Sequence, residues 1–178
     1  MKSKEEIINK DFLSPKGRVG VEVIFKLLSE IPDPEIPVIN IIELGILRDV
    51  ILTDDLCTIV ITPTYSGCPA MRVIEDDIRT KLKEIGIVNV KVELVYSPAW
   101  TTDWISDEAK EKLRAYGIAP PDHSTVDKQV LLGKPRELKC PLCSSTNTEM
   151  ISQFGSTACK ALFRCKECKE PFDYFKCL

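Results

Sequence analysis

Histidine is almost absent from this sequence: the 178 residues contain one, His123. A Glu-x-x-His di-iron site, a 2-His-1-carboxylate iron site and a HExxH zinc site all need histidines that the chain does not have. His123 itself lies in a proline-rich stretch, where an exposed linker residue is a more ordinary interpretation than a metal ligand. Any catalytic metal that this protein serves is therefore expected to lie in another protein.

Long apolar runs are missing too. No stretch approaches the roughly 18 residues of a membrane span, and residues 1–6 (MKSKEE) mix charges and lack the apolar core of a signal peptide. We therefore expect a cytoplasmic protein that does not contact a membrane. Cysteines stay reduced in the cytoplasm, so closely paired cysteines indicate metal binding rather than disulfides.

A strong positive charge is also lacking. Residues 139–178 carry six Lys/Arg against four Asp/Glu, and the net charge of the whole chain is −3. Four thiolates around one Zn²⁺ would lower the charge of this tail by about two, to about zero. Binding to nucleic acid by counterion release needs a clearly basic face, so a nucleic-acid partner is disfavoured.

Cysteine, by contrast, is concentrated at the end of the chain. Two pairs with two intervening residues, Cys140 with Cys143 and Cys165 with Cys168, supply four thiolates. Two such knuckles are typical of a closed, tetrahedral structural zinc site. The spacing therefore predicts a C-terminal zinc ribbon, although four thiolates also suit a single iron ion or an iron–sulfur cluster.

Two further thiols in this tail, Cys159 and Cys177, exceed what one zinc site needs. They could be alternative ligands, a second metal site, a redox pair, or simply small buried residues. The tail also has five aromatic side chains, which we expect to form its core rather than to stack on bases: Phe154, Phe163, Phe172, Tyr174 and Phe175.

The longer N-terminal part shows alternating helical and strand patterns. Apolar spacing predicts helices within 19–31, 70–85 and 106–116, and strands within 39–52, 56–63 and 88–96. The expected fold class is α/β (α+β): a small α-β-β-α-β-α sandwich with helices on one sheet face, followed by a zinc ribbon. We place the first domain at 17–120, a linker at 121–138 and the ribbon at 139–178.

Cys68 is the most informative thiol of the first domain. It follows a predicted buried strand, and Pro69 after it is favoured at the first position of a helix. A thiol at a helix N-terminus faces free N–H groups, which favour the thiolate and lower its pKa. Thr64 and Ser66 would add hydroxyl donors nearby. The alternative is a small buried cysteine at a helix cap, and for Cys57, inside a strand, packing is favoured outright.

Two other loops could join Cys68 at the same edge of the sheet. Residues 33–37 (DPEIP) present Asp33 and Glu35, although Asp33 could merely cap a turn and Glu35 could be solvated. Residues 100–104 (WTTDW) place two large aromatic residues after a strand, where packing is the ordinary role. Ligands of open α/β sheets bind where such loops converge.

These motifs together resemble a known family. Residues 33–37, 43–45 (ELG) and 64–69 (TYSGCP) are similar to the signature of SufT-like iron–sulfur maturation domains, and residues 154–165 and 170–177 resemble the tail of the PaaD family. The resemblance covers about residues 17–178, with both halves in order. One departure is Glu43, where the family usually has Asp, so Glu43 receives no role.

The resemblance implies an accessory, non-enzymatic role in aerobic phenylacetate degradation. Proteins of this family are thought to assist the iron–sulfur or di-iron centres of the ring 1,2-phenylacetyl-CoA epoxidase complex, which would be the protein client. Cys68 then corresponds to the cluster-handling residue and would hold iron or a transient cluster, with Asp33 and Glu35 in the acidic loop. A structural or regulatory subunit of that complex and a zinc-ribbon nucleic-acid binder are the alternatives. A homo-oligomer remains open.

Overall fold

The computed structural model describes residues 20–121 and 138–176. The predicted linker, apart from its ends, lies outside these residues, as do His123 and Cys177. The first part contains α2 (Val21–Leu28), β1 (Leu47–Leu52), β2 (Cys57–Ile61), α3 (Ala70–Glu84), β3 (Val90–Leu94), the 3-10 turn η2 (Thr102–Trp104) and α4 (Asp107–Ala115). The predicted α-β-β-α-β-α order and α/β class are confirmed.

The first sheet has the strand order β1-β2-β3, with β1 antiparallel and β3 parallel to the central β2. A parallel pair needs a crossover, which α3 supplies. Side chains of β2 alternate, so that Cys57, Ile59 and Ile61 are buried while the residues between them are partly exposed. The packing role favoured for Cys57 is thereby confirmed.

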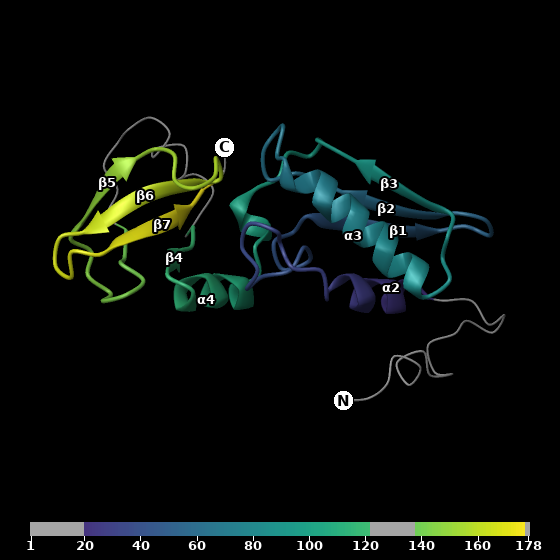
Figure 1. Ribbon diagram of the computed structural model, residues 1–178, viewed down its shortest axis with the longest axis horizontal. Coiled ribbons are helices and arrows are strands. Elements are labelled where there is room, and N and C mark those ends of the chain that lie inside the picture. The colour runs from purple at the N-terminus through teal and green to yellow at the C-terminus, as the bar shows by residue number, and fades with distance from the viewer. Residues whose placement is uncertain (1–19, 122–137, 177–178) are drawn as a thin grey trace, which may run out of the picture.

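Helices α2 and α3 contact each other and cover the sheet face toward which these β2 side chains point (Figure 1). The apolar stripe of α3 consists of Met71, Ile74, Ile78 and Leu82, all buried at three- and four-residue spacing. Because α3 starts directly after the loop that ends β2, its N-terminus lies at the carboxyl edge of the parallel strands. This is the edge at which we expected the functional loops.

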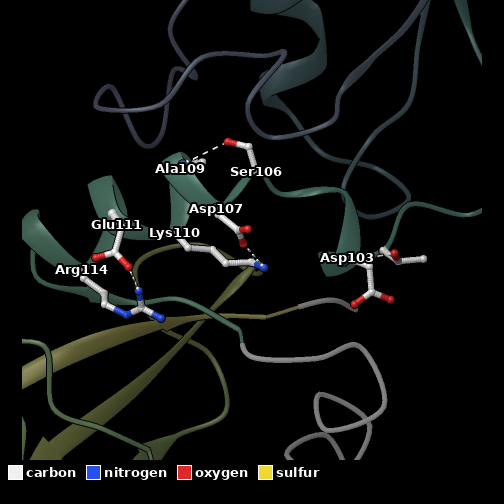
Figure 2. A network of polar contacts seen from close by, with 8 residues as sticks. Asp103, Ser106, Asp107, Ala109, Lys110, Glu111 and Arg114 are labelled. Atoms are coloured by element: carbon white, nitrogen blue, oxygen red, sulfur yellow. Dashed lines mark hydrogen bonds and ion pairs between the residues drawn. The ribbon is translucent and has the colours of Figure 1, made fainter.

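Helix α4 buries Ala109 and Leu113 in the core and has a cap and ion pairs formed by its own polar residues (Figure 2). The Ser106 Oγ accepts a hydrogen bond from the Ala109 N–H at 3.0 Å, which caps the helix. Acidic residues occupy its first turn and basic residues its last, as the helix dipole favours. Two ion pairs one turn apart, Asp107 with Lys110 and Glu111 with Arg114, lie along the surface.

The second sheet contains β4 (Ile118–Ala119), β5 (Thr148–Ser152), β6 (Lys160–Cys165) and β7 (Pro171–Phe175) in the order β4-β7-β6-β5. The strands β5, β6 and β7 form an antiparallel meander, and β4 pairs with β7 in parallel. The last residues assigned to the first domain thus add a strand to the sheet of the ribbon. The division at 120 and 139 stays a prediction.

The ribbon has a small aromatic core of its own. The Phe163 ring stacks on Phe172 and meets Tyr174 edge to face, both with centroids 5.9 Å apart. Phe163, Phe172 and Tyr174 are buried in this core, which confirms the role predicted for three of the five aromatic residues. Phe175 is buried too, but in the core of the first part. Phe154 differs: its ring is 57 % exposed and the Lys176 ammonium lies 4.2 Å from the ring centroid.

The two parts pack against each other at the end of β7, whose arrowhead points toward the first sheet in Figure 1. Phe175 and Cys159, both from the ribbon, belong to the hydrophobic core of the first part. The Phe175 ring meets Trp100 edge to face at 6.0 Å, and the Trp100 indole N–H donates to the Leu44 carbonyl at 2.9 Å. Trp100 is therefore a packing anchor between the two parts.

None of the helices within 20–121 and 138–176 combines the length and the apolar character that crossing a membrane would require.

Candidate functional site

The four paired cysteines come together at one end of the ribbon. The Sγ atoms of Cys140, Cys143, Cys165 and Cys168 all lie within 4.8 Å of one another, with Cys140 and Cys168 at 3.9 Å and Cys143 and Cys165 at 3.4 Å. Tetrahedral zinc with bonds of about 2.3 Å separates its sulfur ligands by roughly 3.8 Å. These thiols therefore fit a single tetrahedral ion.

The two knuckles have the same backbone turn. The residue after each second cysteine, Ser144 and Lys169, has a positive φ of 65° and 67° respectively. These are left-handed conformations that non-glycine residues adopt at some cost. Within the first turn the Ser144 N–H donates to the Cys140 carbonyl at 2.9 Å. Such turns let both thiols of a pair face one point, so the donor set is built into the backbone.

A second site surrounds Cys68, in the loop between β2 and α3. Gly67 has a φ of +85°, which turns the chain sharply, and the Cys68 N–H donates to the Tyr65 carbonyl at 3.3 Å. The Cys68 sulfur, which is partly buried, accepts hydrogen bonds from the Ala70 N–H at the start of α3 and from the Tyr65 hydroxyl. The helix start therefore does present a donor to this thiol, as the sequence indicated.

The direction of the Cys68 pKa shift was nevertheless predicted wrongly. Burial raises the pKa of this thiol, and the negative charges of Glu35 and Asp33 add to the increase. The hydrogen bonds from Ala70 and Tyr65 act the other way but are outweighed. Burial likewise raises the pKa of Tyr65 to about 12, and the neighbouring Cys68 contributes. The surroundings of Cys68 therefore favour the neutral thiol over the thiolate.

The acidic loop is held in a tight turn. Asp33 Oδ1 accepts hydrogen bonds from the Glu35 N–H at 2.9 Å and the Ile36 N–H at 2.8 Å, so Asp33 caps the turn. Burial raises the pKa of the Asp33 carboxyl. Glu35 is only partly exposed, because its carboxylate faces the ribbon, where its Oε2 lies 3.4 Å from the Cys159 sulfur. The fully solvated Glu35 of the alternative interpretation is therefore not found.

Cys68 and the acidic loop share one small cavity with Cys159. The cavity has a volume of about 10 Å³, close to what a single water needs. Its polar and thiol-bearing wall consists of Asp33, Glu35, Thr64, Cys68 and Cys159, and the rest is apolar. The structure brings four of the five predicted site residues together here. Ser66 is exposed and does not line the cavity.

The third predicted loop does not join the cavity. Trp100 packs against Phe175. The Arg48 guanidinium stacks over Trp104, 3.6 Å from the centroid of its ring. Glu43, which received no role from its motif, has a structural one: it accepts a hydrogen bond from the Asn40 N–H at 3.0 Å and pairs with Lys112 on α4.

Sequence patterns did not identify Cys159 as part of this cavity. It lies far from Cys68 along the chain and six residues before a zinc knuckle, so spacing alone associates it with the four paired thiols. Burial raises the pKa of the Cys159 thiol to about 12, the nearby Glu35 carboxylate adds to this, and a hydrogen bond from Thr157 opposes it. Cys177 lies outside the described residues.

Comparison with known proteins finds a matching family model for each half of the chain. A family model described as an iron–sulfur cluster assembly protein matches residues 22–94, and one described as the PaaD zinc beta ribbon domain matches residues 124–176. The chain is 50% identical, over 89% of its length and 93% of the relative, to an Escherichia coli K12 protein provisionally named as one of the subunits of 1,2-phenylacetyl-CoA epoxidase.

Two shorter relatives align with the first part. The chain is 35% identical to an Fe-S protein maturation auxiliary factor of Porphyromonas gingivalis, over 60% of the chain and 97% of the relative. It is 41% identical to the Fe-S protein maturation auxiliary factor SufT of Staphylococcus aureus, over 44% of the chain and 90% of the relative. From these matches and the two sites, the chain belongs to the PaaD family, and it combines an iron–sulfur cluster assembly domain with a PaaD zinc ribbon.

Proposed function

We propose that this protein is a non-enzymatic maturation factor of aerobic phenylacetate degradation. It would assist the assembly or maintenance of the iron–sulfur or di-iron centres of the ring 1,2-phenylacetyl-CoA epoxidase. The observation that carries the proposal is the position of Cys68: a partly buried thiol at a helix start, in one cavity with the carboxylates of Asp33 and Glu35. The name of the relative that matches nearly the whole chain supports the pathway, and the names of the shorter maturation factors support the role in maturation.

The chemistry follows from the surroundings of Cys68. Binding iron or an iron–sulfur cluster as cargo requires loss of the Cys68 thiol proton. Because the pKa of this thiol is raised, it stays protonated and less reactive until the cargo binds. The Ala70 N–H and the Tyr65 hydroxyl then donate to the thiolate. Thr64, 8 % exposed at the same cavity, offers a further hydroxyl. A thiol so arranged can accept cargo and release it again.

The ribbon would have a structural and docking role in this scheme. We infer that the four paired thiols hold one Zn²⁺, which closes the site and leaves no open position for chemistry. The protein client is then a subunit of the epoxidase, and such reduced thiols suit the cytoplasm. Metal analysis of anaerobically purified protein should find about one zinc per chain; iron in its place would overturn the zinc assignment.

The decisive experiment measures metal loading of the epoxidase. The complex is produced in cells that carry wild-type protein, Cys68→Ser or Cys57→Ala, and its iron and sulfide are quantified after purification. We expect Cys68→Ser to lower loading several-fold while the Cys57→Ala control, which removes a buried thiol of β2 remote from the cavity lining, leaves it near wild type. Normal loading with Cys68→Ser would refute the proposal.

One observation favours a second function. The relative that matches nearly the whole chain is named as a subunit of the epoxidase, whereas the named maturation factors match only the first part. A structural or regulatory subunit would form a stable, stoichiometric complex with the mature enzyme, and Cys68→Ser would leave both the complex and its activity unchanged. Co-purification of the wild type and this variant separates the two functions.

A further inference from the structure

We propose that Cys159 of the ribbon, Cys68 and Glu35 together bind one divalent transition-metal ion, so that the cargo site spans both parts of the protein. The inference rests on the proposed function in one respect: Cys68 is taken as the thiol that handles metal. It adds a second thiol ligand, a carboxylate ligand and the class of ion. It also gives the ribbon a direct part in holding the cargo.

The first support is the position of the Cys159 thiol. Cys159 is 4 % exposed, and its sulfur lies between the Thr157 hydroxyl at 3.0 Å and Glu35 Oε2 at 3.4 Å. Cys159 belongs to the apolar core of the first part, but a cysteine that only filled space would need no polar partner. This one faces a carboxylate from the other part of the protein and lines the same cavity as Cys68.

The second support is that the fold fixes this position. The Lys176 N–H donates to the Cys159 carbonyl at 2.9 Å, which extends the pairing of β6 with β7 as far as Cys159. Phe175, the residue before Lys176, is anchored against Trp100. The contact between the two parts therefore carries Cys159 to the acidic loop, and the thiol is held there by buried packing rather than by a surface loop.

The third support is the chemistry of the donor set. Two thiols and one carboxylate are ligands for borderline and soft divalent ions such as Fe²⁺, Co²⁺ and Zn²⁺. A cavity of about 10 Å³ has room for a single ion and not for a cluster. The cation beside these acids, Lys160, is itself buried, with its Nζ 3.3 Å from the Ser156 hydroxyl.

Binding requires a small rearrangement. Among groups of three or more possible ligands in the described residues, only the four zinc-knuckle cysteines have ligand atoms that all lie within 4.8 Å of one another. The sulfurs of Cys68 and Cys159 must therefore turn inward, and the hydrogen bond between Cys159 and Glu35 must open. In the balanced step, one M²⁺ displaces the protons of the two thiols: M²⁺ + 2 RSH gives M(SR)₂ + 2 H⁺, with Glu35 as a further ligand.

The test uses the full chain with its ribbon already loaded with zinc, and Co²⁺ as the probe. Zinc holds thiolate sites more tightly than cobalt, so Co²⁺ should leave the ribbon metal in place; release of zinc is monitored directly. We expect one added Co²⁺ per chain, thiolate-to-cobalt charge-transfer absorption, and release of about two protons per ion. Cys159→Ser should reduce the charge-transfer intensity to about half and weaken binding about 100-fold.

Further variants keep the test decisive. Glu35→Gln, which alters the site from the other part of the protein, should keep the absorption and weaken binding about tenfold, and Cys57→Ala should bind like wild type. Circular dichroism checks that each variant is folded. Loss of binding with Cys68→Ser but not with Cys159→Ser overturns this inference and leaves the proposed function standing. Absence of a second metal site in wild type overturns it as well, whereas the proposed function is judged by epoxidase loading.

Discussion

The Cys159 sulfur lies 3.4 Å from Oε2 of Glu35, although 124 positions of sequence separate the two residues. This contact joins the zinc ribbon to the acidic loop of the iron–sulfur assembly domain. It also adds a thiol to the cavity of Cys68. The two parts of the protein therefore share one site, and the stability of their contact should govern access to it.

Removal of the ribbon metal should unfold the ribbon but not the first part. Within the described residues, the separate ribbon core has eight buried members, too few to offset the loss of the four metal bonds that we propose. We expect Cys143→Ser to lose its zinc and to become sensitive to protease between residues 144 and 170. The helical circular dichroism of α3 should persist. Unchanged protease resistance in a variant shown to be metal-free would contradict this.

Gly45 should tolerate alanine far less well than Gly67 does. Both have positive φ, at 71° and 85°, so alanine costs about 1–2 kcal/mol at either position. At Gly45 the added Cβ would also lie 2.7 Å from the Cβ of Trp104 and 3.0 Å from its carbonyl oxygen, whereas at Gly67 nothing lies within 4 Å. Urea unfolding of both variants measures the difference, and equal destabilisation would be inconsistent with the close approach.

Phe175→Ala should loosen the contact between the two parts. Truncation of a buried phenylalanine costs about 3–5 kcal/mol, and the ring also supports Trp100. We expect iodoacetamide to modify Cys159 and Cys68 faster in this variant, as mass spectrometry of labelled peptides can show. Phe154→Ala is the control. Phe154 is 57 % exposed, and its replacement should leave the labelling rates of Cys159 and Cys68 nearly unchanged. Identical labelling rates in all three proteins would show that Phe175 does not guard the cavity.

The alkaline stability of the protein should depend on Cys57. Burial raises the pKa of this thiol above its ordinary value of 9.0. Above that value the unfolded chain loses the proton while the folded chain keeps it, so stability falls as pH rises from about 9 toward the folded pKa, by at most about 1.4 kcal/mol per pH unit. Cys57→Ala lacks this dependence. Its free energy of unfolding should therefore decline less steeply above pH 9 than that of wild type.

If the free energy of unfolding fell equally steeply with pH above 9 in wild type and in Cys57→Ala, the surroundings of Cys57 would not disfavour its thiolate. Below that pH, Cys57→Ala should be less stable than wild type by a nearly constant amount, because neither state then ionises this thiol.

Much of the fold could be predicted because its signals are local. The stripe from Met71 to Leu82 has the period of a helix, and the alternation in β2 has the period of a strand. Cys-x-x-Cys pairs lie on single turns, so the four-thiol site could be predicted without knowledge of the rest of the chain. The positive φ of Ser144 and Lys169 has no such signal, since neither residue type requires it.

The Cys68 site was only partly predictable. Motif order brought Asp33, Glu35, Thr64 and Cys68 to one edge of the sheet, and the cavity contains all four. The sign of the Cys68 pKa shift depends on how deeply the thiol is buried and on which charges face it, so the helix start alone indicated the wrong direction. Ser66 shows the same limit, since its neighbours in sequence line the cavity and it does not.

The sequence by itself determined the order of helices and strands, the zinc ribbon and the family, because these follow from local periodicity, spacing and motif order. Only the tertiary structure decided that Cys159 faces Glu35 rather than the zinc knuckles, and that the surroundings of Cys68 raise the pKa of its thiol. The physical reason is that the pKa of Cys68 depends on its burial and on the charges of Glu35 and Asp33, whereas the position of Cys159 depends on how Phe175 packs against Trp100. That contact joins residues 75 positions apart, and no local pattern encodes it.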